Sequence, residues 1–309
     1  MKKGFTLVEL LGVIIILGIL SVLIVPKVIN VLNESEEKNN LSSATGLLKA
    51  ADYKYNSDEL NAKNEIIIID YSTNQNVDVL EFSGKKPEAG NIVISKDGQV
   101  AMRVKIGDKC YIKKTYIPDI EVKQYDEDCK IKAKNVGDVV TINDDEFNVI
   151  WSNESETALL RKEILYWGNK FSDTYYWIDP ATNQVKDKYK NGEYIYVYDE
   201  NSSYYEPIEK YKESLGGIAK EARLMKLEES IDLGCNLETH SCQEIYPWLV
   251  ETKLGLGTLV NETSSNTYLW QLYSNEYNGT RQISMISGNG ILSWGALVRP
   301  VIIVNTADI

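Results

Sequence analysis

The chain opens with a long apolar run that gives way to polar residues. From Phe5 to Val25 there are 21 residues, and Glu9 is the one charged residue among them. A helix of that length rises about 30 Å, which is roughly the hydrocarbon thickness of a bilayer. Lys2 and Lys3 precede the run and place the N-terminus in the cytoplasm. No small-residue cleavage site follows, so the run predicts a membrane-spanning helix rather than an ordinary secretory signal.

The helical pattern continues past the apolar run and becomes amphipathic. Pro26 removes a backbone donor and predicts a kink at that point. After the polar stretch 33–40, apolar residues recur at spacings of three and four, which places them on one helix face. We therefore predict a helix of about fifty residues, roughly 75 Å long, whose second half carries a globular head. The predicted face consists of Leu41, Ala44, Leu48, Ala51 and Tyr55.

Short alternating segments follow the helix and predict a small antiparallel sheet. The clearest is 91–106, where apolar residues alternate on both sides of Asp97-Gly98, a dipeptide that favours a hairpin with a type I′ turn. A long helix on such a sheet gives this half an α+β fold. Further strands are predicted at 66–69, 77–82 and 110–116.

Residues 135–309 predict a second, mixed but mainly β, domain. It begins with a hairpin at 136–151, and the Tyr-rich stretch 166–205 predicts loop with one hairpin at 194–198. The other predicted elements are a strand at 157–160, helices at 208–215 and 226–233, and strands at 267–273, 282–287 and 297–304.

Composition narrows the function classes. With 33 Lys and Arg against 45 Asp and Glu, the net charge is −12, which argues against a general nucleic-acid-binding surface. His240 is the single histidine, so His-rich metal sites are nearly excluded. No phosphate-binding glycine loop, paired-carboxylate motif or nucleophile elbow is present. We predict no catalytic residue, no cofactor and no metal, and hence no enzyme.

The residues around Glu9 resemble a known processing signal. A carboxylate in a membrane segment is costly and usually marks a function. Gly4-Phe5-Thr6-Leu7-Val8-Glu9-Leu10, behind a short basic leader, resembles the signal of type IV pilins and of the pseudopilins of type II secretion and competence systems. The resemblance implies cleavage after Gly4, N-methylation of Phe5, and pairing of Glu9 with the N-terminal ammonium of a neighbouring subunit. The alternative is a plain membrane anchor with an incidental glutamate.

The resemblance also implies an organisation, a location and partners. It divides the chain into a leader peptide (1–4), an N-terminal helix (5–57, transmembrane over 5–26), a pilin head (58–134) and an accessory domain (135–309). Pilins carry a matching proline at Pro26, where local melting helps subunits pack. The partners implied are other pilin subunits through the helix, the prepilin peptidase and methylase, and the inner assembly machinery of the pilus. The precursor is expected to be a single-pass membrane protein and the mature subunit to be extracellular in a pilus.

Four cysteines follow the membrane segment and allow two disulfides. Cys110 and Cys129 stand where many pilins close a loop with a disulfide, so the resemblance implies that bridge; two unpaired thiols are the alternative. Cys235 and Cys242 bracket a loop that contains His240. This loop is interpreted as a local disulfide in preference to a metal clip, because structural zinc needs four ligands and the loop offers three.

Several polar groups of the second domain have two interpretations each. The oxygen-rich runs 143–146 and 228–229 could hold calcium, but neither has the fixed spacing of a metal loop, so solvated turns are favoured. Arg223 and Arg299 are expected to anchor buried carboxylates or backbone carbonyls. The 20 Tyr and six Trp suit either the core of β-sheets or exposed surfaces that recognise a host glycan or protein.

The second domain resembles a domain at the C-termini of many Gram-positive surface proteins, which is distantly similar to the C-type-lectin-like fold shared with formylglycine-generating enzymes. The matching pieces are the opening hairpin, Ala222-Arg223-Leu224 with Glu228 and Glu229, Tyr246-Pro247-Trp248-Leu249, and the closing segment 295–302.

The interpretation that joins these features is a minor type IV pilin. A head of this size would crowd a filament built from it alone, so a low-copy or tip subunit is predicted, which displays the second domain for adhesion. Two alternatives stay open. One is a pseudopilin of a type II secretion or competence (DNA-uptake) system, and the other is an enzyme tethered by a pilin anchor.

Overall fold

The computed structural model describes residues 7–57, 66–127, 129–168, 177–179, 184–186, 204–236, 241–242, 246–249, 259–261, 269–277, 280–287 and 296–309. The chain forms two compact units. Unit 1 comprises residues 1–113 and 119–130, and unit 2 comprises residues 114–118 and 131–309. The segment 114–118 lies in sequence within the predicted head, and its membership of unit 2 was not predicted.

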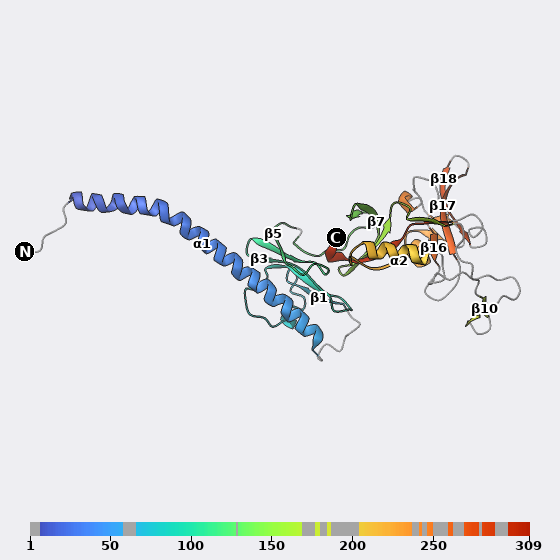
Figure 1. Ribbon diagram of the computed structural model, residues 1–309, viewed down its shortest axis with the longest axis horizontal. Helices are drawn as coiled ribbons and strands as arrows, with labels where there is room; N and C mark the ends of the chain where they lie inside the picture. Colours follow the sequence, from blue (N-terminus) through green and yellow to red (C-terminus); the bar gives the residue numbers. More distant parts are fainter. Residues whose placement is uncertain are drawn as a thin grey trace, which may run out of the picture. The chain divides into compact units, whose positions relative to one another are not determined.

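A single helix, α1 (Leu7–Asn56), dominates unit 1 (Figure 1). It continues through Pro26 and changes direction along its N-terminal half. The predicted face is confirmed at Ala44, Leu48, Ala51 and Tyr55, which all pack in the core on the sheet. It is wrong at Leu41, which is 38 % exposed, and it lacks Leu47, which is fully buried. The reason is that polar Asn40 and Ser43 share the buried face, and the Lys85 backbone N–H donates to Ser43 Oγ (3.0 Å).

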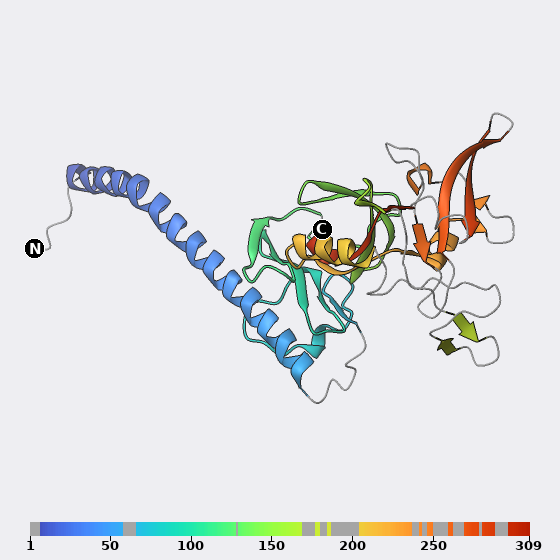
Figure 2. The ribbon, with the colours of Figure 1, turned by 45° about the vertical axis from the view of Figure 1, so that its right-hand side comes forward.

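The C-terminal half of α1 packs along a five-stranded antiparallel sheet of order β1-β2-β3-β4-β5 (Figure 2). Side chains from the helix and from strands β1 to β4 meet in one apolar core, among them Leu47, Ile69, Ile92, Met102 and Tyr111. The last strand, β5, was not predicted. The strands are β1 (Ile67–Asp70), β2 (Ala89–Ile94), β3 (Val100–Ile106), β4 (Lys109–Lys113) and β5 (Glu121–Gln124).

Two local predictions in unit 1 are wrong. The strand predicted at 77–82 is a 3₁₀ turn, η1 (Val77–Val79), because Asn74 and Asn76 adopt left-handed backbone angles (φ 59° and 56°) that bend the chain before it. At the β2–β3 turn, Gly98 (φ 81°) has a positive φ and Asp97 does not, so the turn is not type I′. Instead, the Gly98 N–H closes onto the Ser95 carbonyl oxygen (2.9 Å), as in a three-residue loop that ends on a left-handed glycine.

Unit 2 is built around a five-stranded antiparallel sheet of order β12-β20-β8-β7-β6. The predicted hairpin at its start is confirmed, and its turn is the one with two left-handed residues, Asn143 and Asp144 (φ 48° and 69°). Helix α2 (Tyr205–Ser214) contributes Ile208 and Tyr211 to the core on this sheet. The strands are β6 (Val139–Ile142), β7 (Asp145–Ser152), β8 (Glu156–Arg161), β12 (Ala219–Arg223) and β20 (Val301–Asn305).

Shorter elements complete unit 2. The predicted helix at 226–233 is α3 (Leu227–Asp232), and it ends at Gly234 (φ 93°) as expected. The strand predicted at 297–304 is split into β19 and β20, and the hairpin predicted at 194–198 lies outside the described residues. The remaining elements are β9 (Tyr166–Gly168), β10 (Trp177–Asp179), β11 (Gln184–Lys186), β13 (Met225–Lys226), β14 (Cys235–Asn236), β15 (Ser241–Cys242), β16 (Leu259–Asn261), β17 (Leu269–Tyr277), β18 (Thr280–Ser287), β19 (Ala296–Val298), and the 3₁₀ turns η2 (Pro247–Leu249) and η3 (Thr306–Asp308).

The protein is thus mixed α and β, with a long apolar N-terminal helix and antiparallel sheets. The C-type-lectin-like likeness of the second domain stays a prediction.

Candidate functional site

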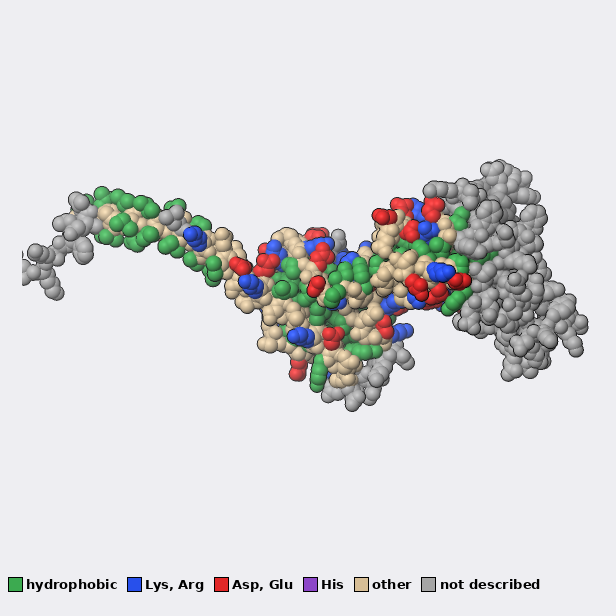
Figure 3. All heavy atoms as spheres, viewed as in Figure 1, with side chains coloured by type: hydrophobic (Ala, Val, Ile, Leu, Met, Phe, Trp, Pro, Cys, Tyr) green, Lys and Arg blue, Asp and Glu red, His purple; other side chains and the backbone are tan. Residues whose placement is uncertain are grey.

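The N-terminal part of α1 is apolar on all sides and is not covered by the rest of the described chain. Exposure of its large apolar side chains ranges from 44 % at Leu20 to 81 % at Leu7. Figure 3 shows this part as an apolar surface interrupted by few charges. Of the described residues, α1 is the one helix whose length and composition would let it cross a bilayer, and its most apolar stretch has a mean hydropathy of 2.7. A helix that is hydrophobic all round needs a membrane or neighbouring helices around it.

Of the predicted processing and assembly residues, Glu9 and Pro26 lie in the described part of this helix. Gly4 and Phe5 lie outside the described residues. Glu9 is in the first turn of α1, and Pro26 lies inside the helix. The assembly roles of Glu9 and Pro26 stay predictions.

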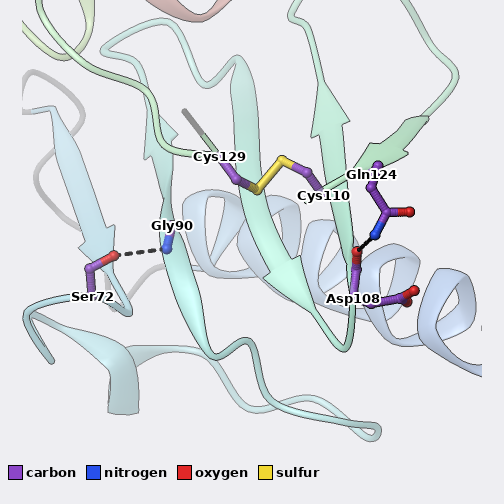
Figure 4. The surroundings of a disulfide bond; sticks show 6 residues. All are labelled: Ser72, Gly90, Asp108, Cys110, Gln124 and Cys129. Carbon is purple, nitrogen blue, oxygen red and sulfur yellow. Dashed lines mark hydrogen bonds between the residues drawn. A yellow bond between two sulfur atoms is a disulfide. The ribbon is translucent and has the colours of Figure 1, made fainter. Parts of the chain in front are cut away.

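A disulfide closes the sheet end of unit 1. Cys110 of β4 bonds to Cys129, 19 residues later, with Cα atoms 5.7 Å apart, as the resemblance implied (Figure 4). The Cys129 segment passes close over β2 at Gly90 (φ 95°), where an added Cβ would lie 2.8 Å from the Cys129 carbonyl oxygen. Lys130 then reaches Asp70 at the end of β1, with Nζ 2.6 Å from Oδ2. The bridge fixes the segment 129–130 to β4, and the ion pair fixes it to β1.

In unit 2, a buried ion pair joins β12 to α3. The Arg223 guanidinium donates to both carboxylate oxygens of Glu229, at 2.8 and 2.5 Å. Trp151 Nε1 and the Lys226 backbone N–H donate to the same carboxylate, at 2.9 and 2.8 Å. The prediction for Arg223 is confirmed, whereas the interpretation of 228–229 as a solvated turn is wrong at Glu229, which is 7 % exposed.

Arg299 anchors backbone carbonyls, as predicted. Its Nε donates to the Arg161 carbonyl oxygen (2.8 Å), and its Nη1 donates to those of Trp248 and Leu249 (3.0 and 2.9 Å). Burial lowers the pKa of Arg299 to about 10, so it keeps its charge at neutral pH. The predicted segment Tyr246–Leu249 is thereby tied to the closing strands of unit 2.

The first oxygen-rich run, 143–146, is partly a solvated turn and partly engaged in contacts within unit 2. Asn143 and Asp144 form an exposed turn as expected, but Asp145 binds Arg161 Nη2 (2.7 Å) and accepts from the Tyr211 hydroxyl (2.7 Å). The Arg161 hydrogen bond holds the pKa of Asp145 below its usual value of 3.8. Across the described residues, no three His, Cys, Asp or Glu side chains are gathered closely enough to hold a metal ion.

The second cysteine pair is placed by strand register. Cys235 is disulfide-bonded, and the β14–β15 ladder sets Cys242 opposite it. This arrangement agrees with a local disulfide rather than a metal clip. His240 lies outside the described residues.

Comparison with known protein families gives a match at the start of the chain. Residues 1–25 match the family described as the prokaryotic N-terminal methylation motif. The chain matches no curated protein and no solved structure. The motif, together with the long apolar helix, supports a type IV pilin-like precursor that is anchored in the membrane. Such a motif implies interaction with other pilin subunits and with a prepilin peptidase.

Proposed function

We propose that the protein is a minor type IV pilin, a low-copy or tip subunit that enters a surface filament and displays unit 2 for adhesion. The observation that carries the proposal is the exposed apolar N-terminal part of α1. The helix begins inside the methylation motif, and its C-terminal half packs on a folded head. In the precursor, the bilayer surrounds this surface. In a filament, the helices of neighbouring subunits would surround it instead.

The charge at Glu9 fits this exchange of surroundings. A carboxylate at this depth is tolerated when an opposite charge meets it in the same apolar layer. The N-terminal ammonium of a neighbouring subunit, produced by cleavage before Phe5, supplies that charge. A plain anchor would have no use for it.

Unit 2 supports the display role because it does not depend on α1 for its core. Its two apolar clusters draw on β7, β8, β12, β20 and α2, all within the unit. A domain with its own core can be carried on a filament without being part of its shaft. Its Tyr and Trp content suits recognition of a glycan or a host protein.

Immunogold labelling of intact cells with antibody to residues 135–309 tests the placement. We expect gold along or at the ends of filaments, at low density compared with the main subunit. Gold confined to the envelope would favour a pseudopilin or a tethered enzyme instead, and a filament in which this chain is the most abundant subunit would contradict the minor role.

Glu9→Ala tests the assembly role. We expect the variant to insert in the membrane and be cleaved normally, but to be missing from sheared filaments, because the intersubunit partner is lost. The matched control is Glu34→Ala, which removes another α1 carboxylate, one that pairs in solvent with Lys38 (2.7 Å). Normal incorporation of Glu9→Ala would count against the pilin interpretation of this charge.

A further inference from the structure

The chain passes between the two units three times. It leaves unit 1 after Lys113, returns after Pro118, and leaves again after Lys130. A linker between two domains needs to cross once. Unit 2 is therefore connected to unit 1 at three points of the chain, and the segment 114–118 belongs to unit 2 although the residues on both sides of it belong to unit 1.

Hydrogen bonds hold the segment 114–118 on unit 2. The Thr115 N–H and hydroxyl donate to the two carboxylate oxygens of Asp308, at 2.8 and 2.5 Å. Lys114 Nζ donates to the Asp308 carbonyl oxygen (2.9 Å), and Asn305 Nδ2 donates to the Thr115 hydroxyl (2.7 Å). Asp308 and Asn305 are both buried. A pull on this segment must therefore break several hydrogen bonds whose acceptors water does not reach.

The disulfide holds the same stretch of chain on unit 1. Cys110 is in β4, and Cys129 comes directly before Lys130, the last residue of unit 1 (Figure 4). The bond closes a ring of chain that contains the segment 114–118. Since β4 ends at Lys113, where the first connection begins, β4 is joined covalently to unit 2 from two of its five residues. In the sheet, β4 pairs with β3 on one side and with β5 on the other.

The strand β5 is attached less firmly than β4. It stands at the edge of the described sheet, where it pairs with β4 alone, and three of its four residues are exposed. Without the disulfide, a pull on the last connection would act on 119–130 and peel β5 away, because an edge strand is held on one side only. With the disulfide, the pull passes from Cys129 through the bond to Cys110, and β5 carries none of it.

We propose that the disulfide and the segment 114–118 form a double attachment that keeps unit 2 joined to β4 when the two units are pulled apart. The disulfide is the covalent attachment. The hydrogen bonds to Asp308 are the second, and they keep the connection at Lys113 short when the disulfide is absent. When both are lost, the chain from 114 to 130 extends as a tether. The inference rests on the proposed display role for the source of the pull, since a domain that binds a surface is pulled against its filament.

Optical tweezers test this on the full chain in detergent micelles. Bio-orthogonal handles are placed at two exposed positions, Tyr53 of α1 in unit 1 and Lys210 of α2 in unit 2. Loss of the double attachment lets residues 114–130 extend, which gives a step of up to about 60 Å at 3.3–3.6 Å per residue. Unfolding of a whole unit gives a much longer step, because each unit contains several times as many residues.

We expect the parent chain and Asp308→Ala to unfold without the short step, because the disulfide carries the pull in both. Cys110→Ser with Cys129→Ser should show the step, and adding Asp308→Ala to this serine variant should lower the force at which the step occurs. Asp119→Ala, which removes an exposed carboxylate next to the segment, is the matched control and should leave that force unchanged. Reduction of the folded parent in the tweezers gives the same comparison without refolding a variant.

The proposal is overturned if the parent shows the short step, or if the serine variant and the reduced parent both lack it. It is also overturned if Asp308→Ala leaves the force in the serine variant unchanged, because the hydrogen bonds would then carry no load. No filament enters the experiment, so its failure would leave the proposed assembly and display roles unaffected.

Discussion

Arg223 and Glu229 form a bidentate ion pair that is almost wholly buried in unit 2. The two residues are 8 % and 7 % exposed, and two parallel hydrogen bonds join them. Since Trp151 and the Lys226 backbone also donate to Glu229, the carboxylate binds β7, β12 and the start of α3 at once. A buried ion pair of this kind adds little net stability as a pair, but the loss of one partner is costly.

Glu229→Ala should therefore destabilise unit 2 by about 3 kcal/mol, because it leaves the Arg223 charge buried. This is the lower end of the usual range, since Glu221 lies 3.0 Å from Arg223 Nε and partly replaces the lost charge. Urea unfolding of the full chain in detergent measures the change. Glu228→Ala, on the exposed neighbour, is the control and should cost less than about 0.5 kcal/mol. A double variant with Arg223→Met should cost less than the two single changes together; strictly additive costs would show that the pair does not act as a unit.

The same carboxylate predicts acid sensitivity. Burial alone would raise the pKa of Glu229, but the Arg223 guanidinium, the Lys226 N–H and the Trp151 N–H outweigh it and hold the pKa below the usual 4.5. In the folded protein, the Glu229 carboxylate then stays unprotonated at a pH where the same carboxylate binds a proton in the unfolded chain. Its stabilising contribution is therefore complete above pH 4.5 and is lost as the pH falls through the lowered pKa.

We expect the urea midpoint of unit 2 to stay level from neutral pH down to about pH 4.5 and to fall below that pH, and to fall less in Glu229→Gln, which cannot titrate. Asp145 contributes in the same direction, because its pKa is also lowered by Arg161. An equal acid dependence in parent and Glu229→Gln would contradict the assignment.

The disulfide of unit 1 gives a third prediction. Cys110 and Cys129 are separated by 19 residues, and closing a loop of that length stabilises a fold by about 3 kcal/mol in the chain-entropy account. Replacing both by Ser should lower the stability of unit 1 by about that amount and leave unit 2 unchanged. Hydrogen exchange of β3 and β4, compared with β7 and β8, measures the two effects separately. Equal loss of protection in both sets of strands would contradict the prediction.

The sequence predicts the secondary structure best where an element depends only on residues that are close to one another in the chain. The membrane-length helix, the 136–151 hairpin and the helix ended by Gly234 were correct because periodicity and turn chemistry act over a few residues. The buried face of α1 was predicted correctly except at Leu41, because Asn40 and Ser43, polar in the sequence, are buried in its place and the Lys85 backbone N–H donates to Ser43. At Glu229, two adjacent glutamates suggest a solvated turn, and nothing local indicates that Trp151, 78 residues earlier, donates to one of them.

A pocket between α1 and the β3–β4 turn could not be predicted from the sequence for the same reason. Its lining residues come from 33–40 and 108–109, and only the packing of α1 on the β3–β4 turn brings them together. The segment 114–118 is the clearest case in which the local sequence pattern could not predict the structure. Apolar alternation extended the strand at 110 as far as Tyr116, but β4 ends at Lys113, since the next residues bind the far end of the chain.

That binding is made by Thr115 and Asp308 and can be tested directly. The Thr115 N–H and hydroxyl donate to the two oxygens of Asp308, at 2.8 and 2.5 Å, and Asn305 Nδ2 donates to the Thr115 hydroxyl (2.7 Å). Asp308 is 5 % exposed, so Asp308→Ala leaves two donors of Thr115 without an acceptor. We expect unit 2 to lose about 1–3 kcal/mol of its free energy of unfolding, with faster hydrogen exchange in both 114–118 and 301–309.

Asp119→Ala, just beyond the segment and exposed, is the control and should change the hydrogen exchange of neither segment. If Asp308→Ala accelerated exchange in 301–309 alone, the segment 114–118 would not belong to unit 2. If it left both unchanged, the hydrogen bonds would carry no stability.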